Sequence, residues 1–342
     1  MLFLADAYLH TLDPFAVRFP ASWPVAGIRW YGLAYAAGFL IGWMMIRWMA
    51  RTGRTIVRLH TVGDLMFYII LGVLLGGRLG YALFYEQKLF IGFDNTFPFW
   101  HLLQINKGGM ASHGGMIGVI LACWLFARKH SVPVGHIFDL AALGCPAGLF
   151  LGRIANFINA ELWGKALPAA MQSNPPWSVK YPGEILGWDS AHLKQIASLE
   201  SIVGVSGPGF TEAVVQKAYQ HDTIVMQTIK PLLTAYYPSQ IFQAITDGPI
   251  LFSMLALIWL KPRKPGVVAS WFLIVYGGLR IVTEIFRQPD AGVPVTLGLQ
   301  RGQWLSVLMM AAGVVGLWLS LGSKVPPLGG LKRSSRDAGL GA

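Results

Sequence analysis

The chain has 342 residues, of which 54% are hydrophobic and 13% are charged, and its formal net charge is +11. A water-soluble protein carries roughly twice that charged fraction, so the composition excludes a soluble protein and indicates an integral membrane protein. The positive charge would also fit a nucleic-acid partner, but its distribution along the chain argues against one.

Seven apolar stretches approach the length of about 20 residues that a helix needs to cross a bilayer. They cover residues 30–48, 62–84, 113–128, 239–260, 267–286 and 303–321, and the fourth runs from about residue 136 into a polar block at residues 152–164. Residues 165–236 are rich in Pro, Gly and Ser, which is typical of a loop-like extramembrane insertion, with helical potential only at about 211–230.

The sequence therefore predicts an all-α polytopic membrane protein with about seven transmembrane helices and an extracytoplasmic head insertion. Residues 1–164 hold the first four spans, residues 165–236 form the head, and residues 237–342 hold the last three spans and a cytoplasmic tail.

Basic clusters follow the first, third, fifth and seventh predicted spans. They are Arg47, Arg51, Arg54 and Arg58; Arg128 and Lys129; Lys261, Arg263 and Lys264; and Lys324, Lys332, Arg333 and Arg336. Because Lys and Arg are enriched in cytoplasmic loops, the N-terminus is predicted outside the cytoplasm and the C-terminus inside it. The net charge is then mostly a signal of topology and of attraction to anionic lipid headgroups, so we expect no nucleic-acid partner.

A polar block closes the fourth span, where Arg153, Asn156, Asn159 and Glu161 follow an apolar run and Gly164 ends the block. Such groups are costly in lipid unless each finds a partner. The block is predicted to cover about three helical turns, with Gly164 as a natural helix stop. Snorkelling to the headgroups could explain Arg153 alone, but it does not require the two Asn and the Glu.

Other polar residues fall at the outer ends of the predicted spans. They are Tyr31, Arg78, His113 with Gly114 and Gly115, Ser239, Gln240, Gln303, and the stripe of Arg280, Glu284 and Arg287 at positions i, i+4 and i+7. Independent snorkelling would scatter such residues over both ends of the spans. We therefore expect one polar, lipid-accessible pocket at the extracytoplasmic face.

Guanidinium groups match phosphate oxygens, and His113 is the natural general base. Gly114 and Gly115 would let another backbone or a ligand come close. The chain has no nucleophile-elbow, paired-aspartate or zinc-protease motif, and we expect neither a metal nor a cofactor. The pocket therefore suits a lipid phosphate, with a nucleophile from a second substrate.

Simpler explanations exist for single residues. His113 could be a satisfied histidine at a helix start, Tyr31 an aromatic-belt residue, Gln303 a helix cap, and the stripe from residue 280 to 287 a structural ion-pair ladder. A transporter or flippase for an anionic lipid is the alternative function, but it would need polar residues in the inner halves of the spans. A lipid-binding scaffold without chemistry would not need His113.

The motifs resemble those of the prolipoprotein diacylglyceryl transferase family, bacterial inner-membrane enzymes of lipoprotein maturation. The matching segments are residues 30–32, 113–118, 152–164, 276–290 and 302–306, and the resemblance covers nearly the whole chain. It departs at Tyr237, Phe242 and Gln243, where the family commonly has His, Tyr and Glu, and residues 186–231 resemble an insertion longer than usual.

The resemblance implies transfer of the diacylglyceryl group of phosphatidylglycerol to the thiol of the lipobox cysteine of a prolipoprotein, with release of glycerol phosphate. The partners it implies are therefore phosphatidylglycerol, a lipobox peptide and membrane lipid. It also implies that Arg153 binds the headgroup, that Arg280 stabilises the leaving group and that His113 is the base. The remaining substrate-binding residues that it implies are Tyr31, Asn156, Asn159, Glu161, Gly164, Glu284, Arg287, Gly114 and Gly115.

Overall fold

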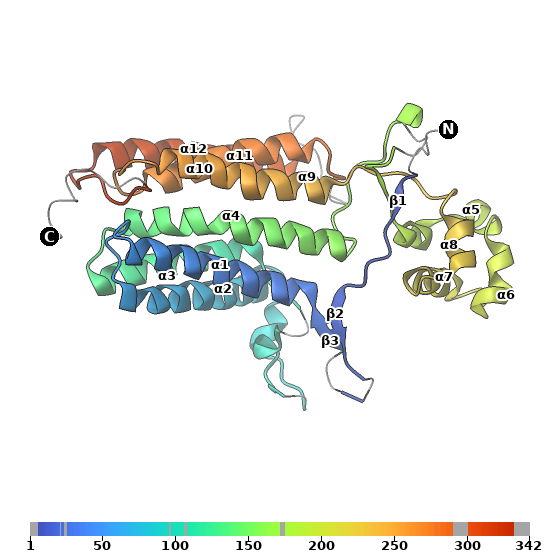
Figure 1. Ribbon diagram of the computed structural model, residues 1–342. Coiled ribbons are helices and arrows are strands. Elements are labelled where there is room, and N and C mark those ends of the chain that lie inside the picture. Colours follow the sequence, from blue (N-terminus) through green and yellow to red (C-terminus); the bar gives the residue numbers. More distant parts are fainter. Residues whose placement is uncertain are drawn as a thin grey trace. The chain divides into compact units, whose positions relative to one another are not determined.

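Long helices dominate the computed structural model, which describes residues 6–20, 22–23, 26–95, 97–105, 108–171, 175–289 and 300–331 (Figure 1). They are α1 (Trp30–Arg51), α2 (Val62–Phe84), α3 (Ser112–His130), α4 (Val134–Ile158), α9 (Ser239–Ile245), α10 (Leu251–Ile258), α11 (Val267–Glu284) and α12 (Arg301–Gly322). A π-helical turn, η8 (Thr246–Ile250), joins α9 to α10.

Six helical segments of the described chain are long and apolar enough to cross a membrane, with α9, η8 and α10 counted as one. Helix α3 occupies the predicted third span but is not among the six, because polar residues begin it at Ser112 and end it at Arg128, Lys129 and His130. The prediction of an all-α polytopic membrane protein is confirmed, and the spans end within a few residues of the predicted positions.

The chain divides into two compact units. The first unit contains Met1–Ala36, Leu149–Ile250 and Gly277–Val307, and the second contains Ala37–Gly148, Leu251–Tyr276 and Leu308–Ala342. Most of the predicted site residues fall in the first unit, whereas His113, Gly114 and Gly115 fall in the second.

In the second unit, α2 and α3 pack closely through glycines. A Cβ atom built on Gly80 would lie 2.7 Å from Gly114 Cα, and one built on Gly76 would lie 2.9 Å from Gly118 Cα. Small residues at helix interfaces are the usual means by which membrane helices approach one another. The close approach that Gly114 permits is therefore that of a neighbouring helix, and its predicted role in substrate binding stays a prediction.

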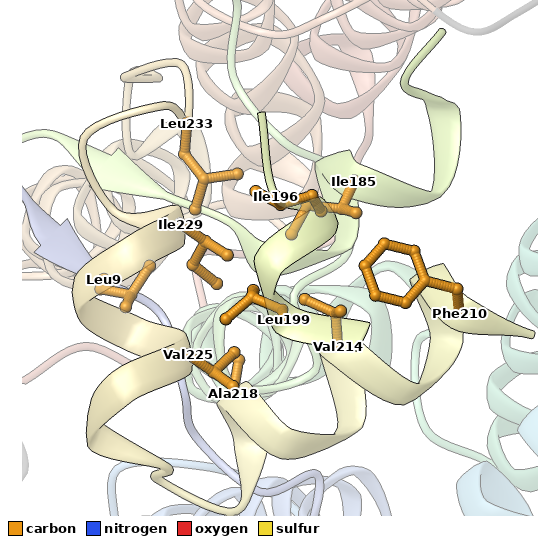
Figure 2. Packing of buried hydrophobic residues seen from close by; sticks show 10 residues of the cluster. All are labelled: Leu9, Ile185, Ile196, Leu199, Phe210, Val214, Ala218, Val225, Ile229 and Leu233. Carbon is orange, nitrogen blue, oxygen red and sulfur yellow. The ribbon is translucent and has the colours of Figure 1, made fainter. Parts of the chain in front are cut away.

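The prediction that residues 165–236 are mostly loop is wrong, because the segment folds into short helices with a core of their own. These are η6 (Pro182–Gly187), α5 (Ser190–Lys194), η7 (Ala197–Leu199), α6 (Glu200–Val203), α7 (Phe210–Tyr219) and α8 (Thr223–Ile229). Asp189 and Asp222 accept backbone N–H bonds at the starts of α5 and α8. Figure 2 shows ten buried apolar side chains that fill the space between these helices, among them Leu199, Val214 and Ile229.

The N-terminal segment is tied into the same unit. Strand β1 (Tyr8–Leu9) pairs in parallel with β4 (Val179–Lys180), and Leu9 joins the core of the short helices. The His10 ring is fully buried, and its Nε2 donates to the Phe157 carbonyl over 2.7 Å. Burial lowers the pKa of His10, which keeps this ring neutral beside the end of α4. A separate hairpin is formed by β2 (Phe15–Arg18) and β3 (Gly27–Arg29).

Candidate functional site

The polar block of residues 152–164 is helical only in its first half, which includes Arg153 and Asn156, and a tight turn replaces the rest of the predicted three helical turns. Helix α4 ends at Ile158, and the Glu161 N–H donates to the Asn156 carbonyl over 3.0 Å. Ala160 and Leu162 have φ angles of 51° and 55°, which no helix allows. The prediction that Gly164 stops the helix is therefore wrong.

Gly164 instead lies where three backbone segments meet. It forms an isolated antiparallel bridge with Arg287, and a Cβ atom on it would overlap the Tyr237 carbonyl oxygen. Beside this bridge, the Lys165 N–H donates to the Phe286 carbonyl over 2.8 Å. Glycine is needed here because a neighbouring backbone approaches too closely for any side chain.

The turn brings three predicted site residues together. The Tyr31 hydroxyl donates to Glu161 Oε2 over 3.0 Å, and Asn156 Nδ2 donates to the Tyr31 hydroxyl. Asn156 is only 9% exposed, whereas Glu161 is exposed. The buried amide of Asn156 thus fixes the Tyr31 hydroxyl, and this hydroxyl in turn orients the exposed carboxylate of Glu161.

Helix α9 fixes the backbone of this turn from the other side. Gln240 Nε2 donates to the Glu161 carbonyl over 2.6 Å, and the Ser239 hydroxyl donates to the Leu162 carbonyl over 3.1 Å. Two of the three residues that differ from the family pattern lie nearby: Tyr237 stacks on Trp177 at 5.7 Å between ring centroids, and Gln243 is buried. At Gln243 a neutral amide stands where an acid was expected, so no carboxylate chemistry can come from this position.

Arg153 forms a buried ion pair with Asp247, a residue that the sequence analysis missed. Arg153 Nε lies 3.1 Å from Asp247 Oδ2, with the two side chains 13% and 1% exposed. The available signal was an acidic residue followed by Gly248 and Pro249 inside the apolar fifth span, because charged residues within a span are rare and mark functional sites.

Arg280 and Glu284 lie on the last turns of α11, and Arg287 lies beyond its end. Arg280 interacts electrostatically with the Asp247 carboxylate. Arg287 Nη1 lies 3.3 Å from Glu284 Oε1, and both side chains are nearly buried. The predicted pairing is present, but the prediction of one helical stripe is wrong for Arg287, because turns of the i to i−3 type replace the helix from residue 285 onward.

Other predicted polar residues have simpler environments. Gln303 Oε1 accepts the Gln300 N–H over 2.9 Å, which is the reciprocal half of a helix cap at the start of α12. Asn159 keeps a buried side-chain oxygen that has no partner among the described residues.

Arg78, in the second unit, is a structural residue. Its guanidinium donates to backbone carbonyls of the following loop, including those of His101, Leu102 and Gly109. The described contacts of this guanidinium are therefore structural, because they hold the backbone at residues 101–104 and 108–109.

His113 lies in the first turn of α3 and is exposed. A Cβ atom built on Gly115 would lie 3.8 Å from Val73 O, which is an ordinary van der Waals contact. The roles assigned to His113 and Gly115 remain predictions.

The arrangement in the first unit can bind an anion at the edge of a membrane. Arg153 is paired with the Asp247 carboxylate, and Arg280 interacts electrostatically with the same carboxylate, which lowers the repulsion between the two positive charges. The neighbouring turn offers a hydroxyl, an amide and a carboxylate. Such a set can hold a phosphodiester and orient a second polar substrate.

Comparison with known proteins points to one family. A family model described as prolipoprotein diacylglyceryl transferase matches residues 20–319. A phosphatidylglycerol–prolipoprotein diacylglyceryl transferase of Bdellovibrio bacteriovorus is 41% identical over 331 residues, covering 90% of this chain and 92% of the relative. Proteins of the same name from Rhodospirillum rubrum and Neisseria gonorrhoeae are 37% and 35% identical, covering 88% and 90% of this chain and 93% and 95% of the relatives.

Proposed function

Because the chain belongs to the prolipoprotein diacylglyceryl transferase family, we propose that it transfers the diacylglyceryl group of phosphatidylglycerol to the lipobox cysteine of prolipoproteins. The observation that carries the proposal is the cluster of Arg153, Asp247 and Arg280 beside the turn of residues 156–164. Guanidinium groups match the oxygens of a phosphodiester, and this cluster supplies two of them.

In the proposed reaction, Arg153 binds the phosphate and Arg280 stabilises the negative charge that develops on it. The thiol gives its proton to His113, and the thiolate sulfur bonds to the terminal carbon of the diacylglyceryl group. The bond between that carbon and the phosphate oxygen breaks, and glycerol phosphate leaves with the electron pair. The step balances without an oxidant or a cofactor.

The remaining residues shape the pocket in this proposal. Tyr31, Asn156 and Glu161 form the hydrogen-bonded wall that orients the headgroup or the peptide. Gly164 and Arg287 fix the backbone behind it, with Glu284 as the counter-charge. Asn159 has a buried oxygen that could accept a substrate N–H or O–H.

We place the enzyme in the bacterial inner membrane, with residues 165–236 as an extracytoplasmic head between membrane domains 1–164 and 237–342. Support comes from the basic clusters after alternate spans. The proposed substrates are phosphatidylglycerol from the outer leaflet and an exported lipobox peptide, and no nucleic acid is required.

A transporter for anionic lipids has less support. It would need a polar path through the inner halves of the spans. Asp139 is a buried acidic residue in the inner half of α4, but its role is structural. Its carboxylate accepts the N–H groups of Gly266 and Ala269, each over 2.8 Å, and so caps the start of α11.

The test is mass spectrometry of a lipobox peptide incubated with the purified protein and phosphatidylglycerol. We expect the peptide to gain the mass of one diacylglyceryl group on its cysteine. The Arg153→Gln and Asn156→Ala variants should insert in the membrane but form no product. A wild-type protein without product would refute the proposed function, and full activity in both variants would refute the site.

A further inference from the structure

The fifth membrane span is interrupted where an acidic residue enters it. Pro249 cannot donate the backbone hydrogen bond that a regular α-helix requires, and residues 246–250 form a π-helical turn. Turns of this kind recur at functional sites because they redirect side chains. Asp247 is the second residue of the turn and is 1% exposed.

Gly248 allows the turn to approach α4. A Cβ atom on Gly248 would lie 2.7 Å from Phe150 Cβ, which is closer than real side chains pack. Phe150 precedes Arg153 by three residues and therefore lies on the same face of α4. In the Asp-Gly-Pro sequence, Asp247 therefore supplies the carboxylate, Gly248 allows the close approach to α4, and Pro249 interrupts the regular helix. Together these features bring Asp247 next to Arg153.

The ion pair that results is not explained by stability. A buried ion pair is seldom better than a well-packed apolar pair, whereas losing one partner leaves an uncompensated charge. Asp247 contacts Arg153 through Nε, so this ion pair does not involve the N–H groups of the two terminal nitrogens, Nη1 and Nη2. Those are the donors that form a planar fork toward phosphate oxygens.

We propose that Asp247 is a positioning residue, which holds the guanidinium of Arg153 in the orientation that receives the phosphate of an anionic lipid headgroup. It acts through Arg153 and does not touch the reacting atoms. Arg280 also interacts electrostatically with Asp247, but the contact that carries the proposal is the ion pair with Arg153. The inference rests on the proposed function and adds to it the residue that orients the lipid ligand.

The experiment is a double-mutant cycle on lipid binding, measured separately from transfer. Wild type, Asp247→Asn, Arg153→Gln and the double variant are titrated with dioleoylphosphatidylglycerol in phosphatidylcholine nanodiscs, and the KM for phosphatidylglycerol and the kcat are measured in parallel. Glu212→Gln, which removes an exposed carboxylate from α7, is the control and should behave as wild type. Thermal unfolding midpoints show whether each variant is folded.

We expect Asp247→Asn and Arg153→Gln each to weaken binding about tenfold, and the double variant to be no worse than Arg153→Gln, because coupled residues are not additive. The KM should rise more than the kcat falls. Wild-type binding in Asp247→Asn, or independent effects that multiply in the double variant, would overturn the proposal.

If Asp247→Asn does not fold, Asp247→Glu takes its place, since it keeps the charge and moves the carboxylate by one methylene. It should weaken binding less than Arg153→Gln, and unchanged binding would overturn the proposal. A wild-type protein that binds phosphatidylglycerol but does not modify the peptide would refute the proposed function alone, and the binding cycle would still decide the role of Asp247.

Discussion

At the scale of single residues, the site depends on a strained turn that neighbouring side chains hold in place. Left-handed φ angles at Ala160 and Leu162 cost about 1–3 kcal/mol each. Hydrogen bonds compensate this cost: Trp163 Nε1 donates to the Ala160 carbonyl over 2.7 Å, and Gln240 and Ser239 bind the next two carbonyls. The strain keeps Glu161 directed at Tyr31.

Replacing Gly164 with alanine tests whether the backbone junction matters for activity. The new Cβ would displace the Tyr237 carbonyl, and overpacking of this kind costs about 1–3 kcal/mol. We expect at least a tenfold loss of peptide modification, because the turn of residues 156–164 must shift. Gly187→Ala is the matched control, since its Cβ would meet no atom within 4 Å. Equal activity of the two variants would contradict the role of the junction.

The residues that belong to the site could be predicted where they lie in a recognisable motif. The sequence associated Tyr31, Asn156 and Glu161 with one pocket, and the structure joins them by hydrogen bonds. Asp247 was missed although it is an acidic residue inside an apolar span, because it belongs to none of the motifs and only the fold shows its pairing with Arg153. The sequence also counted Arg78 with the polar pocket, because spacing alone does not show that loop carbonyls satisfy a guanidinium.

At the scale of elements, glycines determine how α2 and α3 pack. Gly72, Gly76 and Gly80 recur every four residues along one face of α2, opposite Gly114 and Gly118. Between membrane helices the association comes from close van der Waals packing, since lipid supplies no hydrophobic drive. His113 is the second residue of α3 and directly precedes Gly114, so the position of the proposed base depends on this helix packing.

Two alanine substitutions in α2 should therefore have different effects on stability. At Gly76 the Cβ would meet Gly118 Cα at 2.9 Å, and at Gly63 it would meet nothing within 4 Å. Gly76→Ala should lower the free energy of unfolding by about 1–3 kcal/mol. Gly63→Ala should leave it unchanged or raise it by up to about 1 kcal/mol, because alanine favours helix. Thermal unfolding in detergent measures both, and a more stable Gly76→Ala protein would contradict the packing.

The long helices could be predicted from the sequence and the short ones could not. An apolar run with charged ends defines a span by composition alone. The helices of the head have as few as four residues, and such short helices are not stable by themselves. Their stability comes from a shared core, to which Leu9 contributes from a distant part of the chain (Figure 2). The local pattern of apolar residues does not predict such packing between distant segments.

At the scale of the whole molecule, the charge distribution predicts the orientation in the membrane. The loop after α10 contains Lys261, Arg263 and Lys264, whereas the head of residues 165–236 has five Lys and five acidic residues. Lys and Arg are enriched in short cytoplasmic loops such as the one after α10, whereas a long segment such as the head is translocated largely regardless of its charge. The proposed chemistry needs the same orientation, because an exported peptide and a lipid of the outer leaflet must reach one pocket.

Single-cysteine labelling tests this orientation directly. In a protein with Cys123 and Cys145 replaced by alanine, Ser206→Cys places a thiol on the exposed surface of the head and Lys261→Cys places one after α10. A membrane-impermeant maleimide added to intact spheroplasts should label the first variant. It should label the second only after the membrane is permeabilised, because the basic loop is expected in the cytoplasm. Both variants should retain activity, which shows that the labelled protein is folded. Labelling of the Lys261→Cys variant in intact spheroplasts would reverse the topology and remove the exported peptide from reach of the site.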